Sequence, residues 1–563
     1  MCASCRQCEA GGLSGFAFGE GEAPAEPCWL HKMDSTIEMV GYGDNKPVFT
    51  GFLVRAGGFA PFIAHDFNGG GSRCGCQTPC LHLIIKIDKL LRLINKEGSM
   101  DYARAVMYMQ SLKRFGIKLG NERFEALLER LGNPHHQLRV IHVAGTNGKG
   151  STSAFIATIL QAAGYKVGLY LSPYVFNLRE RIQVNGYMIP EADFARLVTW
   201  IKPHIEDLAQ TSLGQVTEFE LKTAVGFSCF AEQRVDFAVV EVGLGGRLDA
   251  TNVVRPLVSV ITSIGWDHMD RLGDTLGKIA AEKAGIIKPY APVVTGVTEQ
   301  EPLEVIREHA HRAGVPLTEV KPERMVIPPP VRTVHWQDEG VHRMRQRVSV
   351  RTTDGVYRHL SLRLLGKHQC SNAAVAIAAV EALQHAHRVE IPESAIRAGL
   401  EYTTLPGRMQ IVRRSPTLLL DGAHNVDAAR CLAQAITDTF HYRRLILVLG
   451  MTKGHDPQGV VDTLAPLASH IIFTQPKERA RPAVDLPEAS TVALPPYEII
   501  PSVPEAVEYA MNMAQAEDLV CVTGSFYVVG EVPLEKWQPR RITNPEEGMS
   551  YAASGENAGN GTP

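Results

Sequence analysis

The chain has 563 residues, a formal net charge of −3, 45% hydrophobic residues and 21% charged residues. This composition is ordinary for a globular protein and excludes wholesale disorder, and the near-neutral charge argues against holding nucleic acid by bulk electrostatics. No stretch approaches the ~20 uninterrupted apolar residues of a membrane span, and the N-terminus shows no signal-peptide pattern. We expect a cytoplasmic enzyme of roughly two to four domains that binds neither nucleic acid nor a membrane.

Residues 1–99 differ in composition from the rest of the chain. Seven of the eleven cysteines lie in the first 80 residues. The C-x-x-C spacing of Cys2, Cys5 and Cys8 suits zinc or an iron–sulfur cluster, although no second pair completes a ligand set. The other interpretation is that translation starts at Met100, because the Lys-Glu-Gly run before it can be encoded as a purine-rich ribosome-binding site. Residues 1–99 are then a disordered or non-native extension, which N-terminal sequencing of the protein from its native gene would test.

From Met100 onward, strand and helix patterns alternate over more than 400 residues, which is typical of parallel α/β architecture. Buried strands are predicted at 139–143, 166–171, 235–242, 257–264 and 293–297. Helices are predicted at 151–163, 276–285 and 372–384. The proline-rich stretch 327–330 and the strand-like residues after it indicate a peripheral hairpin.

A second α/β set begins after Leu405-Pro-Gly407, which we interpret as a domain boundary and hinge. Its strands are predicted at 417–420, 445–449, 471–474 and 519–523. The expected fold is a P-loop parallel-sheet ATPase domain, residues 100–404, followed by a smaller Rossmann-like α/β domain, residues 405–541. The tail, residues 542–563, is rich in Gly, Asn, Ser and Glu and is expected to be disordered.

The strongest local signal is the segment Val143-Ala-Gly-Thr-Asn-Gly-Lys-Gly-Ser-Thr152, which follows a predicted strand and opens a predicted helix. Glycines let a backbone wrap closely around a phosphate, and a helix N-terminus directs N–H groups at an anion. Lys149 adds a positive charge, and Ser151 or Thr152 can reach a magnesium ion. The spacing departs from the usual phosphate loop because a glycine separates the lysine from the serine. The alternative is a glycine-rich β–α turn that binds no ligand.

Three further segments place polar residues at strand ends or in loops. Glu241 ends a buried strand, where a carboxylate is costly unless it is paired or bound to a metal such as magnesium. Asp421 follows a strand of the second domain, at the edge where open α/β sheets bind ligands. His268 and Lys283 lie between these two segments, and each alone would be interpreted as a structural or solvated residue.

Together these segments resemble the folylpolyglutamate synthase/dihydrofolate synthase family of the Mur-ligase-like superfamily of ATP-dependent amide ligases. The resemblance covers about residues 100–535. Its motifs include Gly145-Thr-Asn-Gly-Lys-Gly-Ser151, Leu171-Ser-Pro-Tyr174, Glu180-Arg-Ile182, Glu241-Val-Gly-Leu-Gly-Gly-Arg-Leu-Asp-Ala-Thr-Asn252, Asp267-His268, Glu282-Lys-Ala-Gly-Ile286, Pro406-Gly-Arg408 and Asp421-Gly-Ala-His-Asn425. The segment Met451-Thr-Lys-Gly-His-Asp456 departs from the family pattern in its spacing, so no role is assigned to Lys453 or His455.

The resemblance implies an ATP site, two magnesium sites and a pterin site. The implied ATP ligands are Gly145, Thr146, Asn147, Gly148, Lys149, Gly150, Ser151, Asn372, Arg408, Asp421 and His424. The implied ligands of one magnesium ion are Ser151, Ser172 and Glu241, and those of the second are Glu241, His268 and Lys283, with Lys283 expected to be carbamylated. The expected catalytic residues are Lys149, Glu241, His268 and Lys283, and the expected pterin contacts are Phe219 and Asp249.

The implied reaction is the ATP-dependent addition of L-glutamate to tetrahydrofolate, and to dihydropteroate, through an acyl phosphate that yields ADP and phosphate. The resemblance also implies a monomer whose partners are these small molecules. Three alternatives stay open: an enzyme that acts on folates only, a peptidoglycan Mur-type ligase, and a non-catalytic nucleotide-binding regulator. A Mur-type ligase would place a folded nucleotide-sugar domain before the phosphate loop, and a regulator would have lost one or more of the four catalytic residues.

Overall fold

The computed structural model describes residues 100–116, 120–323 and 332–537, together with the backbone of three short strands that precede them. These strands, β1 (Thr36–Met39), β2 (Phe52–Arg55) and β3 (Phe62–Ile63), form an antiparallel sheet in a separate compact unit. The predictions about the N-terminal cysteines and about the tail 542–563 fall outside the described residues. The second compact unit contains both of the larger sheets.

Within the described residues, eleven strands form one mixed sheet in the order β14-β13-β12-β11-β10-β9-β4-β8-β5-β6-β7. Neighbouring strands from β12 to β5 are parallel, and antiparallel strands extend both edges. The strands are β4 (Val140–Ala144), β5 (Val167–Tyr170), β6 (Ile182–Val184), β7 (Tyr187–Met188), β8 (Phe237–Glu241), β9 (Pro256–Ile261), β10 (Val293–Thr295), β11 (Leu317–Pro322), β12 (Arg332–His342), β13 (Arg345–Arg351) and β14 (Val356–Leu362). The expected hairpin corresponds to β12 and β13, and β14 adds a further antiparallel strand at that edge of the main sheet.

Helices cover both faces of this sheet because successive side chains of each buried strand point to opposite faces. On β8, Phe237 and Val239 pack with α4, α10 and α11, whereas Ala238 and Val240 pack with α2, α3, α5 and α6. The second face continues under α8 and α9, next to β9 and β10. The helices are α2 (Tyr102–Ser111), α3 (Glu122–Arg130), α4 (Lys149–Ala162), α5 (Glu191–Ala209), α6 (Glu218–Glu232), α8 (Leu276–Ala284), α9 (Gln300–Ala313), α10 (Lys367–His387) and α11 (Glu393–Tyr402).

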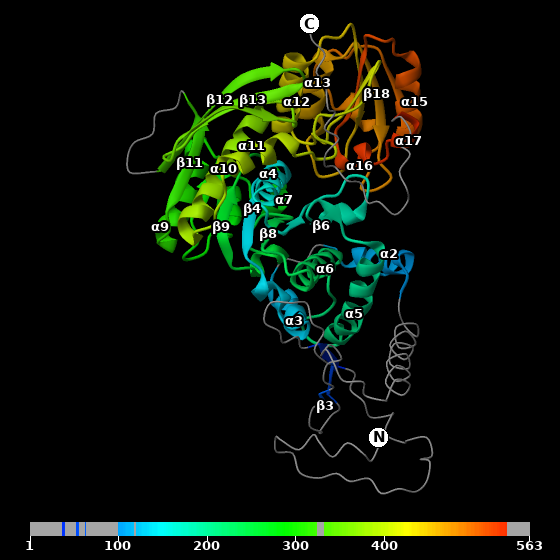
Figure 1. Ribbon diagram of the computed structural model, residues 1–563. Helices are drawn as coiled ribbons and strands as arrows, with labels where there is room; N and C mark the ends of the chain where they lie inside the picture. The colour runs from blue at the N-terminus through cyan, green and yellow to red at the C-terminus, as the bar shows by residue number, and fades with distance from the viewer. Residues whose placement is uncertain are drawn as a thin grey trace, which may run out of the picture. The chain divides into compact units, whose positions relative to one another are not determined.

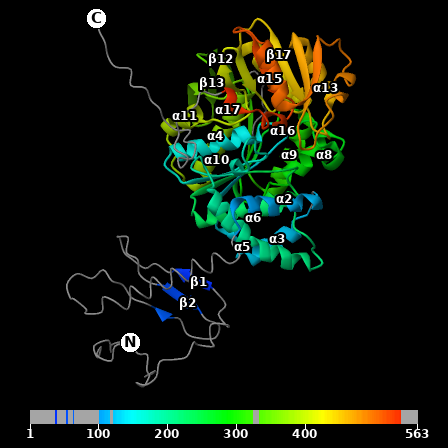
Figure 2. The ribbon, with the colours of Figure 1, turned by 90° about the vertical axis from the view of Figure 1, so that its right-hand side faces the viewer.

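A second, six-stranded sheet follows in the order β15-β16-β20-β17-β18-β19, with only β15 antiparallel to its neighbour. Its strands are β15 (Gln410–Arg414), β16 (Thr417–Leu420), β17 (Leu445–Gly450), β18 (His470–Gln475), β19 (Tyr497–Ser502) and β20 (Leu519–Thr523). Helices α12 (Val426–Thr439) and α13 (Pro457–Leu464) cover one face, and α15 (Val503–Met513) and α16 (Phe526–Val529) cover the other. Figure 1 shows these helices grouped around the second sheet, away from α3, α5 and α6, and Figure 2 shows the same for α13, α15 and α16.

The predicted order of a larger parallel α/β sheet and a smaller α/β sheet is confirmed. Parallel strands place their carboxyl ends along one edge of a sheet, so the loops after β4, β8 and β9 lie side by side. The loops after β16, β20 and β17 have the same relation in the second sheet. Among the helices that the structure describes, none combines the length and the apolar character needed to cross a bilayer.

Candidate active site

A cleft of about 380 Å³ lies between the strand ends of the two sheets. All fifteen residues predicted for the ATP site, the metal sites and catalysis line this cleft. Phe219 and Asp249, the two predicted pterin contacts, do not line it. The structure thus brings segments from both sheets to one cavity.

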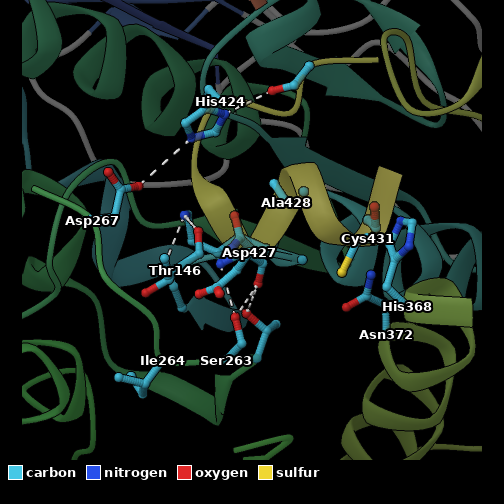
Figure 3. Close-up of a pocket in the computed structure, with 18 of the residues that line it drawn as sticks. Thr146, Ser263, Ile264, Asp267, His368, Asn372, His424, Asp427, Ala428 and Cys431 are labelled. Atoms are coloured by element: carbon cyan, nitrogen blue, oxygen red, sulfur yellow. Dashed lines mark hydrogen bonds and ion pairs between the residues drawn. The ribbon is translucent and has the colours of Figure 1, made fainter. Parts of the chain in front are cut away.

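The loop between β4 and α4 has the conformation of a phosphate cradle. Gly148 caps α4 with φ 82°, a left-handed conformation that favours glycine, and a Cβ there would lie 2.3 Å from Asn372 Oδ1. The segment after β9 holds the loop in place: Thr146 N donates to Ser263 O at 2.8 Å, and Asn147 N donates to Ser263 Oγ at 3.0 Å (Figure 3). The first turn of α4 therefore presents free N–H groups to the cleft at a fixed position.

Two lysines converge on the same loop from different helices. Lys149 Nζ donates to the carbonyls of Gly145 and Thr146, at 3.0 and 2.9 Å. Lys283, on α8, is 4% exposed, and its Nζ donates to the Gly145 carbonyl at 2.9 Å. Burial, reinforced by the Lys149 cation, lowers the pKa of Lys283 to about 7. The amine of Lys283 is therefore readily deprotonated near neutral pH. Lys149 belongs to the phosphate loop itself.

Glu241 brings a carboxylate to the wall of the cleft at the end of β8. The side chain is 3% exposed, and its Oε2 accepts a hydrogen bond from Ser172 N at 2.7 Å. Burial raises the pKa of Glu241, and the nearby Lys149 ammonium opposes that shift. Ser151, in the first turn of α4, lines the same wall. Two hydroxyl side chains and one carboxylate therefore share this part of the cleft.

The second sheet contributes Arg408, Asp421 and His424 from the opposite side. The guanidinium carbon of Arg408 lies 3.9 Å from the ring centroid of Phe526, and burial lowers the pKa of this arginine. Asp421 accepts hydrogen bonds from Met409 N and Ala423 N, at 2.8 and 2.9 Å, so it organises the loop after β16. His424 Nδ1 donates to the Gly422 carbonyl at 2.8 Å, which leaves Nε2 facing the cleft.

Asn425 joins the two sheets through a reciprocal pair of amide hydrogen bonds. Its Nδ2 donates to Asn147 Oδ1 at 3.1 Å, and Asn147 Nδ2 donates to Asn425 Oδ1 at 3.3 Å. Asn425 also caps α12, because Oδ1 accepts from Ala428 N at 2.9 Å. Asn425 belongs to the motif Asp421-Gly-Ala-His-Asn425 and had no predicted role. The structure places it as a direct link from the second sheet to the phosphate loop.

His455 was assigned no role from the sequence, and the structure places it beside Asp267, a residue that lines the cleft. It follows β17, and its Nδ1 lies 3.4 Å from Asp267 Oδ1. His424 Nε2 lies 3.8 Å from the other oxygen of Asp267, as Figure 3 shows, and His268 Nε2 lies 3.9 Å from Oδ1. These nearby imidazoles hold the pKa of Asp267 well below its usual range. One carboxylate of the first sheet thus faces two histidines of the second.

The two predicted pterin residues meet at Gly243, just beyond β8. A Cβ at Gly243 would lie 2.4 Å from Phe219 Cζ and 3.0 Å from Asp249 Oδ2. Asp249 is buried and its carboxylate is engaged: Oδ2 accepts from Leu244 N at 2.8 Å, and Oδ1 accepts from Thr251 N at 3.0 Å and from Thr251 Oγ1 at 2.6 Å. Asp249 therefore shapes the loop that carries it, while the ring of Phe219 lies alongside.

Comparison with known proteins shows the protein family to which this architecture belongs. Residues 143–380 match the Mur ligase middle domain, and residues 407–526 match the Mur ligase glutamate ligase domain. The dihydrofolate synthase/folylpolyglutamate synthase of Bacillus subtilis is 39% identical over 77% of this chain and 98% of that protein. The structure of E. coli FolC in complex with DHPP and ADP has a TM-score of 0.67 at 33% identity, covering 77% of this chain and 97% of that one.

The Mycobacterium tuberculosis folylpolyglutamate synthase complexed with ADP is also similar, with a TM-score of 0.70 at 30% identity. It covers 76% of this chain, and this chain covers 98% of it. The two matched domains thus define a Mur ligase, an ATP-dependent ligase. Within that class, the chain belongs to the folylpolyglutamate synthase/dihydrofolate synthase family.

We expect the substitution His455→Ala to lower kcat about tenfold. Removal of the imidazole takes one of two cross-sheet partners from Asp267, whose side chain is 10% exposed, and a poorly solvated carboxylate that loses a partner is destabilised. His455→Asn keeps a donor near Asp267 and should retain more activity. His441→Ala changes an exposed histidine on the same domain and is the control. Equal kcat values for the wild type and His455→Ala would contradict a role for this residue.

Proposed function

We propose that this enzyme adds L-glutamate to tetrahydrofolate and also to dihydropteroate, with conversion of ATP to ADP and phosphate. One observation supports this most strongly: residues of both sheets line one cleft. Lys149 and Glu241 come from the first sheet, and Arg408 and His424 come from the second. The Bacillus subtilis relative carries both activities in its name. We expect a monomer that works in the cytoplasm on these small molecules.

The chemistry requires activation because a carboxylate is a poor acyl donor, whose leaving group would be oxide. Transfer of the γ-phosphoryl group of ATP breaks the bond to the β,γ-bridging oxygen, forms an acyl phosphate and releases ADP. The amine of L-glutamate then attacks the acyl carbon, loses a proton, and phosphate departs. Lys149 would offset the charge that spreads over the phosphoryl oxygens. Approach of the two sheets around the nucleotide would exclude water, which otherwise hydrolyses the acyl phosphate.

The residues around Glu241 fit a magnesium ion bound with the nucleotide. Glu241 is nearly fully buried, and a neighbouring cation would keep its carboxylate ionised. In the part of the chain that the structure describes, no three His, Cys, Asp or Glu side chains form a group that could hold a metal. An ion here would therefore also need the hydroxyls of Ser151 and Ser172 and phosphate oxygens, which suits magnesium. When bound, magnesium would neutralise charge on the phosphoryl group being transferred.

Lys283 fits the second ion only if its amine is modified. A protonated lysine repels a metal, whereas the amine of Lys283, with a pKa lowered to about 7, is populated in its neutral form. A neutral amine attacks carbon dioxide, forms a C–N bond and loses a proton, which gives a carbamate with two ligand oxygens. Lys283 would then join Glu241 and His268 at the second ion. Mass spectrometry of protein kept in bicarbonate tests for this modification.

Activity on dihydropteroate is the finer part of the proposal. It is supported by the name of the Bacillus subtilis relative, whereas Phe219 and Asp249, which meet at Gly243 beside the strand that ends in Glu241, would bind the pterin ring of either acid. An aromatic ring and a buried carboxylate are groups that stack on and hydrogen bond to a pterin. Restriction of the enzyme to folates is the remaining alternative within the family.

The direct experiment supplies the full chain with ATP, magnesium and L-glutamate, and offers dihydropteroate and tetrahydrofolate in parallel. Products are weighed by mass spectrometry, and ADP is measured as a check on coupling. We expect one glutamate to be added to each acid, with one ADP released for each bond formed. Addition to tetrahydrofolate alone would remove the dihydropteroate half of the proposal. Addition to neither acid would overturn it.

A further inference from the structure

Two buried cations lie together outside the cleft, beside aromatic rings. Arg181, at the end of the short 3₁₀ helix η4 (Leu178–Arg181), is 8% exposed, and Lys222 on α6 is 7% exposed. The guanidinium carbon of Arg181 lies 5.8 Å from the ring centroid of Tyr174 and 6.0 Å from that of Phe219. Lys222 Nζ lies 5.9 Å from the Tyr174 ring centroid. Tyr174 therefore lies within reach of both cations, which we call the Arg181–Lys222 pair.

The charge of the Arg181–Lys222 pair is only partly compensated. Lys222 Nζ has an acidic partner, Glu218 Oε1, at 2.8 Å. Arg181 Nε and Nη1 are buried and lack hydrogen-bond partners among the described residues. Burial and the neighbouring Arg181 cation lower the pKa of Lys222 to about 8. Two cations placed together in a poorly solvated position are costly, and an anion bound between them would remove that cost.

The position of the pair indicates which part of a substrate it would meet. Arg181 lies beside Phe219, a proposed pterin contact, and its charge also acts to lower the pKa of Glu241, a proposed metal ligand. Neither cation lines the ATP cleft, so an anion bound to them does not overlap the nucleotide phosphates. Pairing with two cations also withdraws charge from a carboxylate and makes it a weaker nucleophile. The pair therefore suits a substrate carboxylate that does not react.

We propose that Arg181 and Lys222 bind the non-reacting carboxylate of the terminal glutamate of a folate substrate. This inference rests on the proposed function and names a specificity element within it. The terminal glutamate of tetrahydrofolate carries two carboxylates, one that is activated and one that must be accommodated unchanged. Dihydropteroate has only the carboxylate that reacts. The Arg181–Lys222 pair therefore favours the addition of glutamate to folates over the first addition to dihydropteroate.

The test compares the two acids in one enzyme. The substitution Lys222→Met keeps the length of the side chain and removes its charge. We expect it to raise KM for tetrahydrofolate about tenfold, with kcat, KM for ATP and KM for dihydropteroate each within about threefold of wild type. Arg181→Lys should keep most of the affinity for tetrahydrofolate, and Arg181→Met should lose it. Lys202→Met, on α5, where the lysine side chain is 40% exposed and pairs with Glu206, is the matched control.

Each outcome separates this inference from the function on which it rests. If the wild type consumes tetrahydrofolate only, dihydropteroate serves as a competitive inhibitor and its Ki replaces its KM. An unchanged KM for tetrahydrofolate in active Lys222→Met overturns the inference alone. Equal losses for both acids also overturn it, because they indicate a general packing role. A wild type that neither binds nor consumes either acid overturns the inference together with the proposed function.

Discussion

Replacement of Lys149 by methionine is expected to lower kcat/KM for ATP about 10³-fold. Lys149 directly follows Gly148, which has a positive φ, and its Nζ is held on the carbonyls of Gly145 and Thr146. The ammonium is therefore fixed over the loop that would hold the transferring phosphoryl group. Fixed positive charge at that place stabilises the transition state more than the ground state, so its removal should lower kcat as well as raise KM.

The matched control for Lys149→Met is Lys278→Met. Lys278 is exposed on α8, and its ion pair with Asp274 is also exposed, so its loss should leave turnover unchanged. Steady-state rates over a range of ATP concentrations, with tetrahydrofolate and glutamate saturating, give kcat and KM separately. A Lys149→Met enzyme within tenfold of the wild type would show that the lysine does not act on the phosphoryl group.

The phosphate loop could be predicted from the sequence because its determinants are local. Its glycines, lysine and hydroxyls lie within one short segment, and the flanking strand and helix set their direction. The helix begins at Lys149 rather than at the predicted Ser151, because Gly148 adopts the left-handed capping conformation. Strand β13 was predicted to be strand-like for a related local reason: its charged residues alternate with uncharged ones, and the structure buries Gln346, Val348 and Val350 among the latter.

The contacts between the sheets could not be predicted in this way. The approach of His455 to Asp267 and of Asn425 to Asn147 joins residues far apart in the chain, and it depends on how two separately formed sheets meet. The altered spacing of the motif around His455 also gave no indication that this residue lies beside Asp267. The Arg181–Lys222 pair could not be predicted either. A lysine on a helix is ordinarily solvated, and only the packing of the folded chain shows that Lys222 is buried.

Replacement of Lys283 by methionine is expected to lower kcat about 10²-fold while it stabilises the folded protein. The loss of activity follows from the proposed carbamate, since methionine cannot supply ligand oxygens at the second ion. Lys283→Ala with a small carboxylic acid added tests the same point, because the acid can enter the space and replace the carbamate oxygens. Partial recovery of turnover with the acid is the expected result, and no recovery at any acid concentration would argue against a carbamate.

The gain in stability follows from the charge that burial penalises. The pKa of Lys283 is lowered to about 7 in the folded chain, whereas an unfolded lysine titrates near 10.5, so the unfolded state binds the proton more tightly. The penalty is fully present below pH 7 and disappears as the pH rises toward 10.5. In protein treated with a chelator and free of carbon dioxide, Lys283→Met should therefore melt several degrees above the wild type at pH 6. The difference should shrink steadily toward pH 9, because the wild type alone gains stability over that range. A methionine variant that melts below the wild type at pH 6 would show that the buried Lys283 ammonium does not destabilise the folded protein.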